Sequence, residues 1–154
     1  MKKITSFTVD HNTLEVGVYI SRIDGDITTY DMRFIKPNTP PFLPNPVMHT
    51  IEHLFATYSR NSEYADNVIY FGPMGCRTGF YFLVKDLDNQ TALDLIKETI
   101  KKCIDHHGDI PGNTAIECGN YLEHDVEGAN EALKKYFEVI KDYKVEQLDY
   151  NYCK

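Results

Sequence analysis

A cluster of five prolines constrains the fold of this chain more than any other feature of its sequence. The prolines are Pro37, Pro40, Pro41, Pro44 and Pro46. Proline fixes the backbone angle φ and has no N–H to donate, so no helix or strand can run through this segment. Too little chain precedes the cluster to fold alone, so we expect a loop that leads into a helix. Residues 1–154 are therefore expected to form a single domain, since one core is usual at this length.

Patterns of apolar residues predict the elements on both sides of this loop. β-Branched and aromatic side chains predict strands at residues 14–20, 28–35, 67–71 and 78–84. Helical spacing of apolar residues predicts helices at 47–61, 91–106 and 127–141. The turn residues 24–26 join the first two strands as a hairpin, and Asn89 and Gly108 are expected to cap and end the second helix. The pattern predicts an α+β fold, an antiparallel sheet with helices packed on one face.

The charge and the lack of long apolar runs exclude several classes of partner. Lys and Arg number 16 and Asp and Glu number 23, which gives a net charge of −7. An acidic surface repels phosphates, so neither nucleic acid nor a membrane is expected as a partner. The first residues show no export signal, so we expect a cytoplasmic protein. In that reducing compartment, cysteines are packed thiols, metal ligands or reactive groups rather than disulfides. The four are Cys76, Cys103, Cys118 and Cys153.

The segment His49-Thr50-Ile51-Glu52-His53 is the strongest chemical signal in the sequence. Residues four apart share one helical face, so the imidazoles of His49 and His53 can reach one ion. Glu52 stands beside them as a group that can move protons. This H-x-x-E-H order is that of the inverted zincins. The alternative is a surface helix with two unrelated histidines.

Two histidines need a third ligand, and a catalytic site leaves a fourth position open to water or substrate. The candidates are the carboxylates and Cys76, Cys103, Cys118, His106, His107 and His124. Cys103 lies near the apolar stripe of its helix and is expected to be a packed thiol. His106 and His107 follow the same helix, where they can interact with its free carbonyls. Periodicity does not decide between Cys118 and Cys76.

A second segment, residues 73–80, places a thiol in a tight turn. It reads Pro73-Met74-Gly75-Cys76-Arg77-Thr78-Gly79-Phe80. Glycines let a backbone come close to a ligand, and a cation next to a thiol can stabilise the thiolate. The alternative is a turn with an incidental cysteine.

Taken together, these segments resemble the LuxS family, the S-ribosylhomocysteine lyases. The resemblance rests on the two segments above and on residues 6–11, 31–34 and 117–119, in the same order and at similar separations. It implies that His49, His53 and Cys118 hold a divalent metal, Fe²⁺ first, with Zn²⁺ or Co²⁺ as substitutes. It implies that Glu52 and Cys76 transfer protons. It also implies a substrate pocket lined by Ser6, His11, Arg33 and Arg60.

The implied reaction converts a small-molecule substrate, S-ribosyl-L-homocysteine, into L-homocysteine and 4,5-dihydroxy-2,3-pentanedione, the autoinducer-2 precursor. The family is a homodimer with its sites at the subunit interface, so some of these groups would serve the partner's site. The sequence departs from the family at Tyr70, where members carry an aspartate associated with the amino-acid end of the substrate. A phenol cannot supply a carboxylate for an ammonium group.

Two other functions fit part of the pattern. A small inverted-zincin metallohydrolase would use Glu52 to activate water, would need a carboxylate as third ligand and would give Cys76 no task. A non-catalytic or substrate-shifted homologue would bind metal or ligand, which Tyr70 makes conceivable. Replacing Cys76 separates the lyase from the hydrolase, and release of homocysteine separates the lyase from a binding protein.

Overall fold

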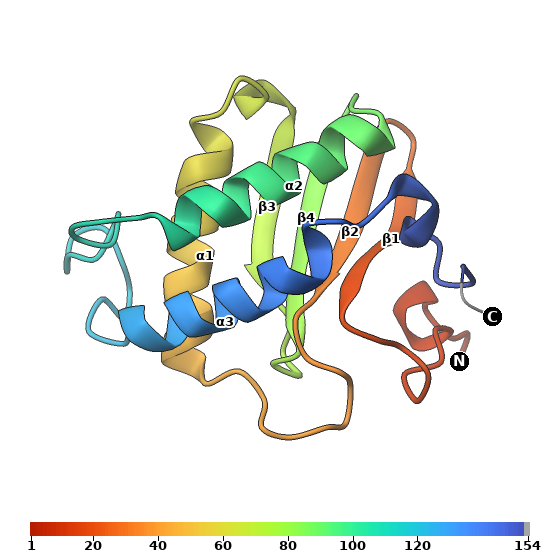
Figure 1. Ribbon diagram of the computed structural model, residues 1–154, viewed down its shortest axis with the longest axis horizontal. Coiled ribbons are helices and arrows are strands. Elements are labelled where there is room, and N and C mark those ends of the chain that lie inside the picture. The colour runs from red at the N-terminus through yellow and green to blue at the C-terminus, as the bar shows by residue number, and fades with distance from the viewer. Residues whose placement is uncertain (153–154) are drawn as a thin grey trace.

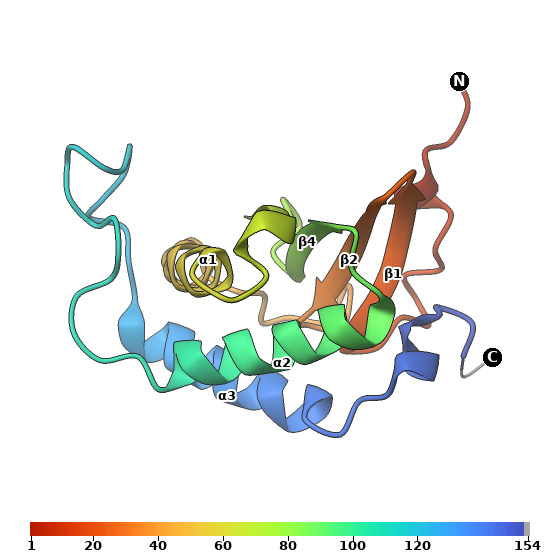
Figure 2. The same cartoon turned by 90° about the horizontal axis from the view of Figure 1, so that it is seen from above.

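The computed structural model describes residues 1–152, so Cys153 lies outside the described residues. Its strands are β1 (Gly17–Asp24), β2 (Ile27–Arg33), β3 (Val68–Pro73) and β4 (Gly79–Lys85). Its helices are α1 (Asn45–Arg60), α2 (Asn89–Ile104) and α3 (Val126–Ile140). Short 3-10 turns include η1 (Thr5–Phe7) and η3 (Val145–Leu148). The predicted α+β fold, with helices against one face of an antiparallel sheet, is confirmed (Figures 1 and 2).

The order of the strands decides which elements lie next to residues 49–53 and 73–80, the two segments singled out in the sequence. The sheet runs β1-β2-β4-β3, and every neighbouring pair is antiparallel. The proline-rich loop carries the chain from β2 to α1, which packs beside β3 at the far edge from β1 (Figure 1). Helices α2 and α3 lie next to each other in a second layer (Figure 2). The hairpin turn between β3 and β4 therefore ends near the first helix.

One face of the sheet forms the core, and among the described residues no α-helix packs on the other face. Met32, Phe80 and Phe82 are fully buried beneath the helices. Side chains of the opposite face alternate with them and include Tyr70, which is 53% exposed. The period of two along each strand produces this division between the faces.

The cap of the second helix differs from the prediction. Asp88, not Asn89, is the cap residue, and its carboxylate accepts a hydrogen bond from the backbone N–H of Thr91. This bond lowers the pKa of Asp88. Asn89 is instead the first helical residue, and its side chain accepts a hydrogen bond from Tyr30 at 2.7 Å. The helix ends at Ile104, four residues before Gly108.

Gly79 should not tolerate a side chain, because β2 passes too close to it. A Cβ at this position would lie 2.3 Å from the carbonyl oxygen of Met32. We expect Gly79→Ala to lower the free energy of unfolding by about 1–3 kcal/mol, the usual cost of overpacking. Gly75→Ala is the control, because nothing lies within 4 Å of a Cβ there. Urea unfolding of both variants measures the difference; equal stability would contradict the close approach.

Among the described residues, none of the helices is long and apolar enough to cross a lipid bilayer.

Candidate metal centre

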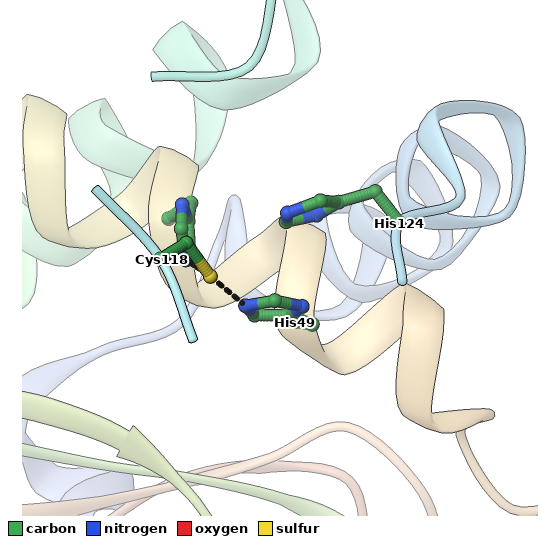
Figure 3. A group of neighbouring side chains, drawn as sticks. His49, Cys118 and His124 are labelled. Atoms are coloured by element: carbon green, nitrogen blue, oxygen red, sulfur yellow. Dashed lines mark hydrogen bonds between the residues drawn. The ribbon is translucent and has the colours of Figure 1, made fainter. Parts of the chain in front are cut away.

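Helix α1 and the loop before α3 bring together three side chains that could ligate a metal ion. His49 and His53 stand one helical turn apart on α1, and Cys118 reaches them from the loop (Figure 3). The Cys118 Sγ lies 3.4 Å from Nε2 of His49 and 3.8 Å from Nε2 of His53. Around a tetrahedral ion with ordinary bond lengths, a sulfur and a nitrogen are about 3.5 Å apart. The spacing therefore suits one shared divalent ion.

Hydrogen bonds on the far side of each ring fix how the two histidines present their nitrogens. Nδ1 of His49 donates to the carbonyl oxygen of Glu123 at 2.7 Å, and Nδ1 of His53 donates to that of Pro111 at 2.8 Å. A carbonyl only accepts, so the ring proton is on Nδ1 in both residues. Each Nε2 then offers a lone pair that can bind an ion, and the single thiol proton of Cys118 can be donated to one of the two. The residues present fit a divalent metal.

His124 is a fourth member of this cluster. One nitrogen of His124 and the ligating atoms of the other three residues all lie within 4.8 Å of one another. Its ring stacks on that of His49 with 4.1 Å between the centroids (Figure 3). Burial lowers the pKa of His124, and the charges of His49 and His53 lower it further. His124 was one of several candidates by sequence; its stacking on His49 depends on a loop conformation that no periodicity predicts.

The remaining candidates for the third ligand lie outside this cluster. His106 accepts a hydrogen bond from Tyr58 and donates one to the carbonyl of Asp109, so both of its nitrogens are engaged. Cys103 is 2% exposed and packs in the core, as expected. The sequence left Cys76 and Cys118 as equal alternatives, and of these two only Cys118 is part of the cluster.

Cys103 should be chemically inert in the folded protein. Burial raises the pKa of its thiol to about 12, so the reactive thiolate is scarce at pH 8. Cys76 is exposed and should be alkylated first. Iodoacetamide treatment at pH 8 followed by peptide mass spectrometry is expected to find Cys76 modified and Cys103 unmodified until the protein is denatured. Early modification of Cys103 would contradict this packing.

Two cavities meet at Glu52. One, of about 360 Å³, is lined by His49 and Glu52 of α1 and by the turn residues Gly75 and Arg77. The other, of about 350 Å³, is lined by Glu52, His53, Arg60 and Tyr70. Cavities of this size hold small molecules. Glu52 therefore stands beside the cluster with space for a ligand on both sides.

Cys76 is linked to a buried charge network through Thr78. The Cys76 Sγ lies 3.1 Å from the hydroxyl oxygen of Thr78, which accepts a hydrogen bond from Arg33 at 2.7 Å. Because that oxygen accepts from Arg33, its own proton is free to be donated to the sulfur. Burial alone would lower the pKa of Arg33, but the charge of Asp31 and its 2.6 Å hydrogen bond raise it. Arg33 is 3% exposed, and the hydroxyl of Thr78 connects its guanidinium to the Cys76 sulfur.

The other expected pocket residues divide into two places. Arg60 lines the second cavity and donates a hydrogen bond to the carbonyl of Ile69. Ser6 and His11 belong to the amino-terminal segment beyond β1, across the molecule from α1 and the loop that carries Cys118 (Figures 1 and 2). Within one chain, these two residues are not brought to the cluster.

Comparison with known proteins tests the resemblance seen in the sequence. The family model described as S-Ribosylhomocysteinase (LuxS) matches residues 4–147. The chain belongs to the LuxS family. LuxS relatives named S-ribosylhomocysteine lyase include one from Borreliella afzelii, 43% identical, and one from Clostridium acetobutylicum, 45% identical. Each alignment covers 97% of this chain and 99% of the relative. A LuxS relative from Phocaeicola vulgatus is 44% identical over 97% of this chain and 98% of its own.

Sequence reasoning missed the groups that orient this LuxS cluster. They are the carbonyls of Glu123 and Pro111 and the hydroxyl of Thr50. The hydroxyl of Thr78, which lies between Arg33 and Cys76, was also missed. The carbonyls leave no trace in a sequence. Thr50 lies inside the H-x-x-E-H segment, and its small polar side chain on a helix with one buried face was the available signal.

Proposed function

We propose that this chain cleaves S-ribosyl-L-homocysteine to L-homocysteine and 4,5-dihydroxy-2,3-pentanedione, working as one domain over residues 1–154. The observation that carries the proposal is the shared cavity. His49 of the cluster, Glu52 and the turn that holds Cys76 line one space of about 360 Å³. A hydrolase would leave that turn without a task, whereas a lyase needs a second proton-transfer group there.

His49, His53 and Cys118 would hold the metal, and we propose Fe²⁺, with Zn²⁺ or Co²⁺ as substitutes. Two imidazoles and one thiolate accept all three ions. When bound, the ion supplies Lewis-acid stabilisation of the negative charge that develops on the sugar oxygens. The protein contributes the rigid orientation of the ligands through the carbonyls of Glu123 and Pro111.

Glu52 and Cys76 would carry the protons. The thioether at carbon 5 can leave only after the carbonyl has moved from carbon 1 to carbon 3, because β-elimination needs an acidic hydrogen on carbon 4. Each migration removes a proton from one carbon and returns it to the next, with a matching transfer between oxygens. Glu52 can serve one side of the substrate and Cys76 the other. Arg33 and Thr78 would hold the Cys76 sulfur ready as a base.

We also propose a homodimer whose sites lie at the subunit interface. Large apolar side chains exposed on the amino-terminal segment, on the open face of the sheet and on the loop around Cys118 support it. They are Ile4 and Phe7, Tyr70, and Ile116 and Leu122. Exposed apolar groups of this kind mark surfaces for a partner. In such a dimer, Ser6 and His11 of one subunit would complete the site of the other.

Mixing two inactive variants tests this arrangement. If the site combines Cys76 of one subunit with His11 of the other, a mixed dimer of His11→Ala and Cys76→Ala has one intact site. Random re-association should then restore about a quarter of the wild-type rate, because half the dimers are mixed and each has one working site. Each variant alone, refolded in the same way, is the control. No recovery on mixing would place each site within one chain.

A reducing compartment, the cytoplasm, suits this chemistry, because Cys76 and Cys118 must remain thiols. The direct test of the activity uses protein loaded with Fe²⁺ without oxygen and then given S-ribosylhomocysteine. A thiol reagent should detect many equivalents of homocysteine per chain, with the dihydroxypentanedione formed in equal amount. Absence of released thiol from metal-loaded protein would overturn the proposal and favour a binding protein.

A further inference from the structure

His124 carries a buried nitrogen that the proposed mechanism does not use. No described residue forms a hydrogen bond with its Nε2, and that atom is shielded from solvent. A buried polar atom without a partner is costly, so such atoms in folded proteins point to a function. One nitrogen of His124 also belongs to the group of atoms within 4.8 Å of one another around His49, His53 and Cys118.

The hydrogen bonds around Thr50 fix which nitrogen of His124 carries the proton. The hydroxyl of Thr50 has one proton, which it donates to the carbonyl of Pro46 at 2.9 Å. Its oxygen accepts the backbone N–H of Asp125 at 3.0 Å. Nδ1 of His124, 3.0 Å from the same oxygen, must therefore donate. The proton sits on Nδ1, and Nε2 is a buried acceptor without a partner among the described residues.

The orientation of the ring excludes His124 as a fourth ligand of the same ion. The rings of His49 and His124 are within 17° of parallel, with their centroids 4.1 Å apart. An ion bound to His49 lies in the plane of that ring, about 2.0 Å from Nε2. Such an ion would be at least about 2 Å out of the His124 plane, given the contact distance between stacked rings. The lone pair of His124 lies in its own plane, and the Thr50 bond holds that plane in place.

We propose that His124 is a substrate-binding residue whose Nε2 accepts a hydrogen bond from a sugar hydroxyl of the substrate beside the metal's open fourth position. The inference rests on the proposed function and deepens it. A neutral acceptor selects a hydroxyl, which has a proton to donate, over a carbonyl or carboxylate, which has none. His124 therefore favours a polyhydroxylated substrate, and Thr50 is the positioning residue that keeps Nε2 unprotonated.

Two substitutions separate this role from a structural one. In His124→Asn, the side-chain amide can still donate to Thr50 but places no atom where Nε2 was. In His124→Gln, the amide oxygen can reach that place and accept. We expect kcat/KM for S-ribosylhomocysteine to fall about tenfold or more in His124→Asn, the scale of one lost hydrogen bond, and to recover in part in His124→Gln. His106→Asn is the matched control and should keep the wild-type value, because His106 lies outside the cluster.

Metal binding provides the readout independent of activity. Zn²⁺ affinity, measured against a chelator, and the visible spectrum of the Co²⁺ form should be the same in His124→Asn as in the wild type. A loss of affinity of tenfold or more with an altered Co²⁺ spectrum would make His124 a ligand and overturn the inference. Unchanged kcat/KM with unchanged metal binding would also overturn it. If the wild-type protein itself releases no homocysteine, the proposed lyase activity is wrong. If the wild type is active and only the expected effect of His124→Asn is missing, the role of His124 alone is wrong.

Discussion

Cys76→Ala should lower the rate of homocysteine release by about 10²–10⁴-fold, the usual contribution of a positioned acid or base. The physical reason is that alanine cannot take or return a proton at the turn that lines the same cavity as Glu52. Metal content should remain that of the wild type, because Cys76 is not part of the cluster of His49, His53 and Cys118. Thiol release and metal analysis on the same preparation measure both quantities.

Cys103→Ala provides the matched control for that experiment. It also removes one thiol, but from the core, so it should affect stability and not the rate of release. A metallohydrolase does not need Cys76, so Cys76→Ala would leave its activity unchanged. Full activity of Cys76→Ala would therefore remove the lyase mechanism and leave the hydrolase as the better account.

Removing a ligand should have the second large effect, on the metal itself. His53→Ala and Cys118→Ala each leave two of the three ligating side chains, and both should weaken binding of Zn²⁺ or Co²⁺ by at least about 100-fold. Replacing a group that only orients a ligand already costs 10- to 100-fold in typical sites. Titration against a chromophoric chelator measures the affinity, and His107→Ala is the control for loss of an exposed histidine.

Thermal unfolding tests the same loss of metal binding by a second measurement. Metal that binds only the folded state stabilises it by about 4 kcal/mol at a concentration 1,000 times its Kd. Adding Zn²⁺ should therefore raise the Tm of the wild type and of His107→Ala, and raise that of His53→Ala much less. An equal rise in all three proteins would mean that the ion binds elsewhere.

The elements of the fold were predictable because each has a local signal. Periods of two and of 3.6 residues placed all four strands and three helices within a few residues of their observed bounds. The cap was missed by one residue, since Asp88 and Asn89 are both good caps and only the backbone conformation chooses between them. The end of α2 was missed because Gly108 lies in the loop beyond it, where its φ is positive.

The candidate site was predictable only where it lies on one helix. His49 and His53 share a face of α1, so spacing alone brought them together. Cys118 is 65 residues from His53 on an irregular loop, and no periodicity places such a residue. The family resemblance, not local physics, selected it over Cys76.

Arg33 illustrates a further limit. The resemblance implied a residue that lines the substrate pocket, whereas its guanidinium is buried against Asp31 and Thr78. Asp31 lies on the same strand, but Thr78 comes from just before β4. Tyr150 donates a hydrogen bond to the same carboxylate from the far end of the chain. Contacts between residues so far apart in the chain leave no local pattern in the sequence, so they could not be predicted from it.

X-ray absorption at the metal edge of the reconstituted protein tests the central claim most directly. If His49, His53 and Cys118 share one ion, a Zn²⁺-loaded sample must show one sulfur at about 2.3 Å and at least two imidazole nitrogens at about 2.0–2.1 Å. The sulfur contribution must disappear in Cys118→Ala. A spectrum of the wild type with only nitrogen and oxygen neighbours would contradict the account.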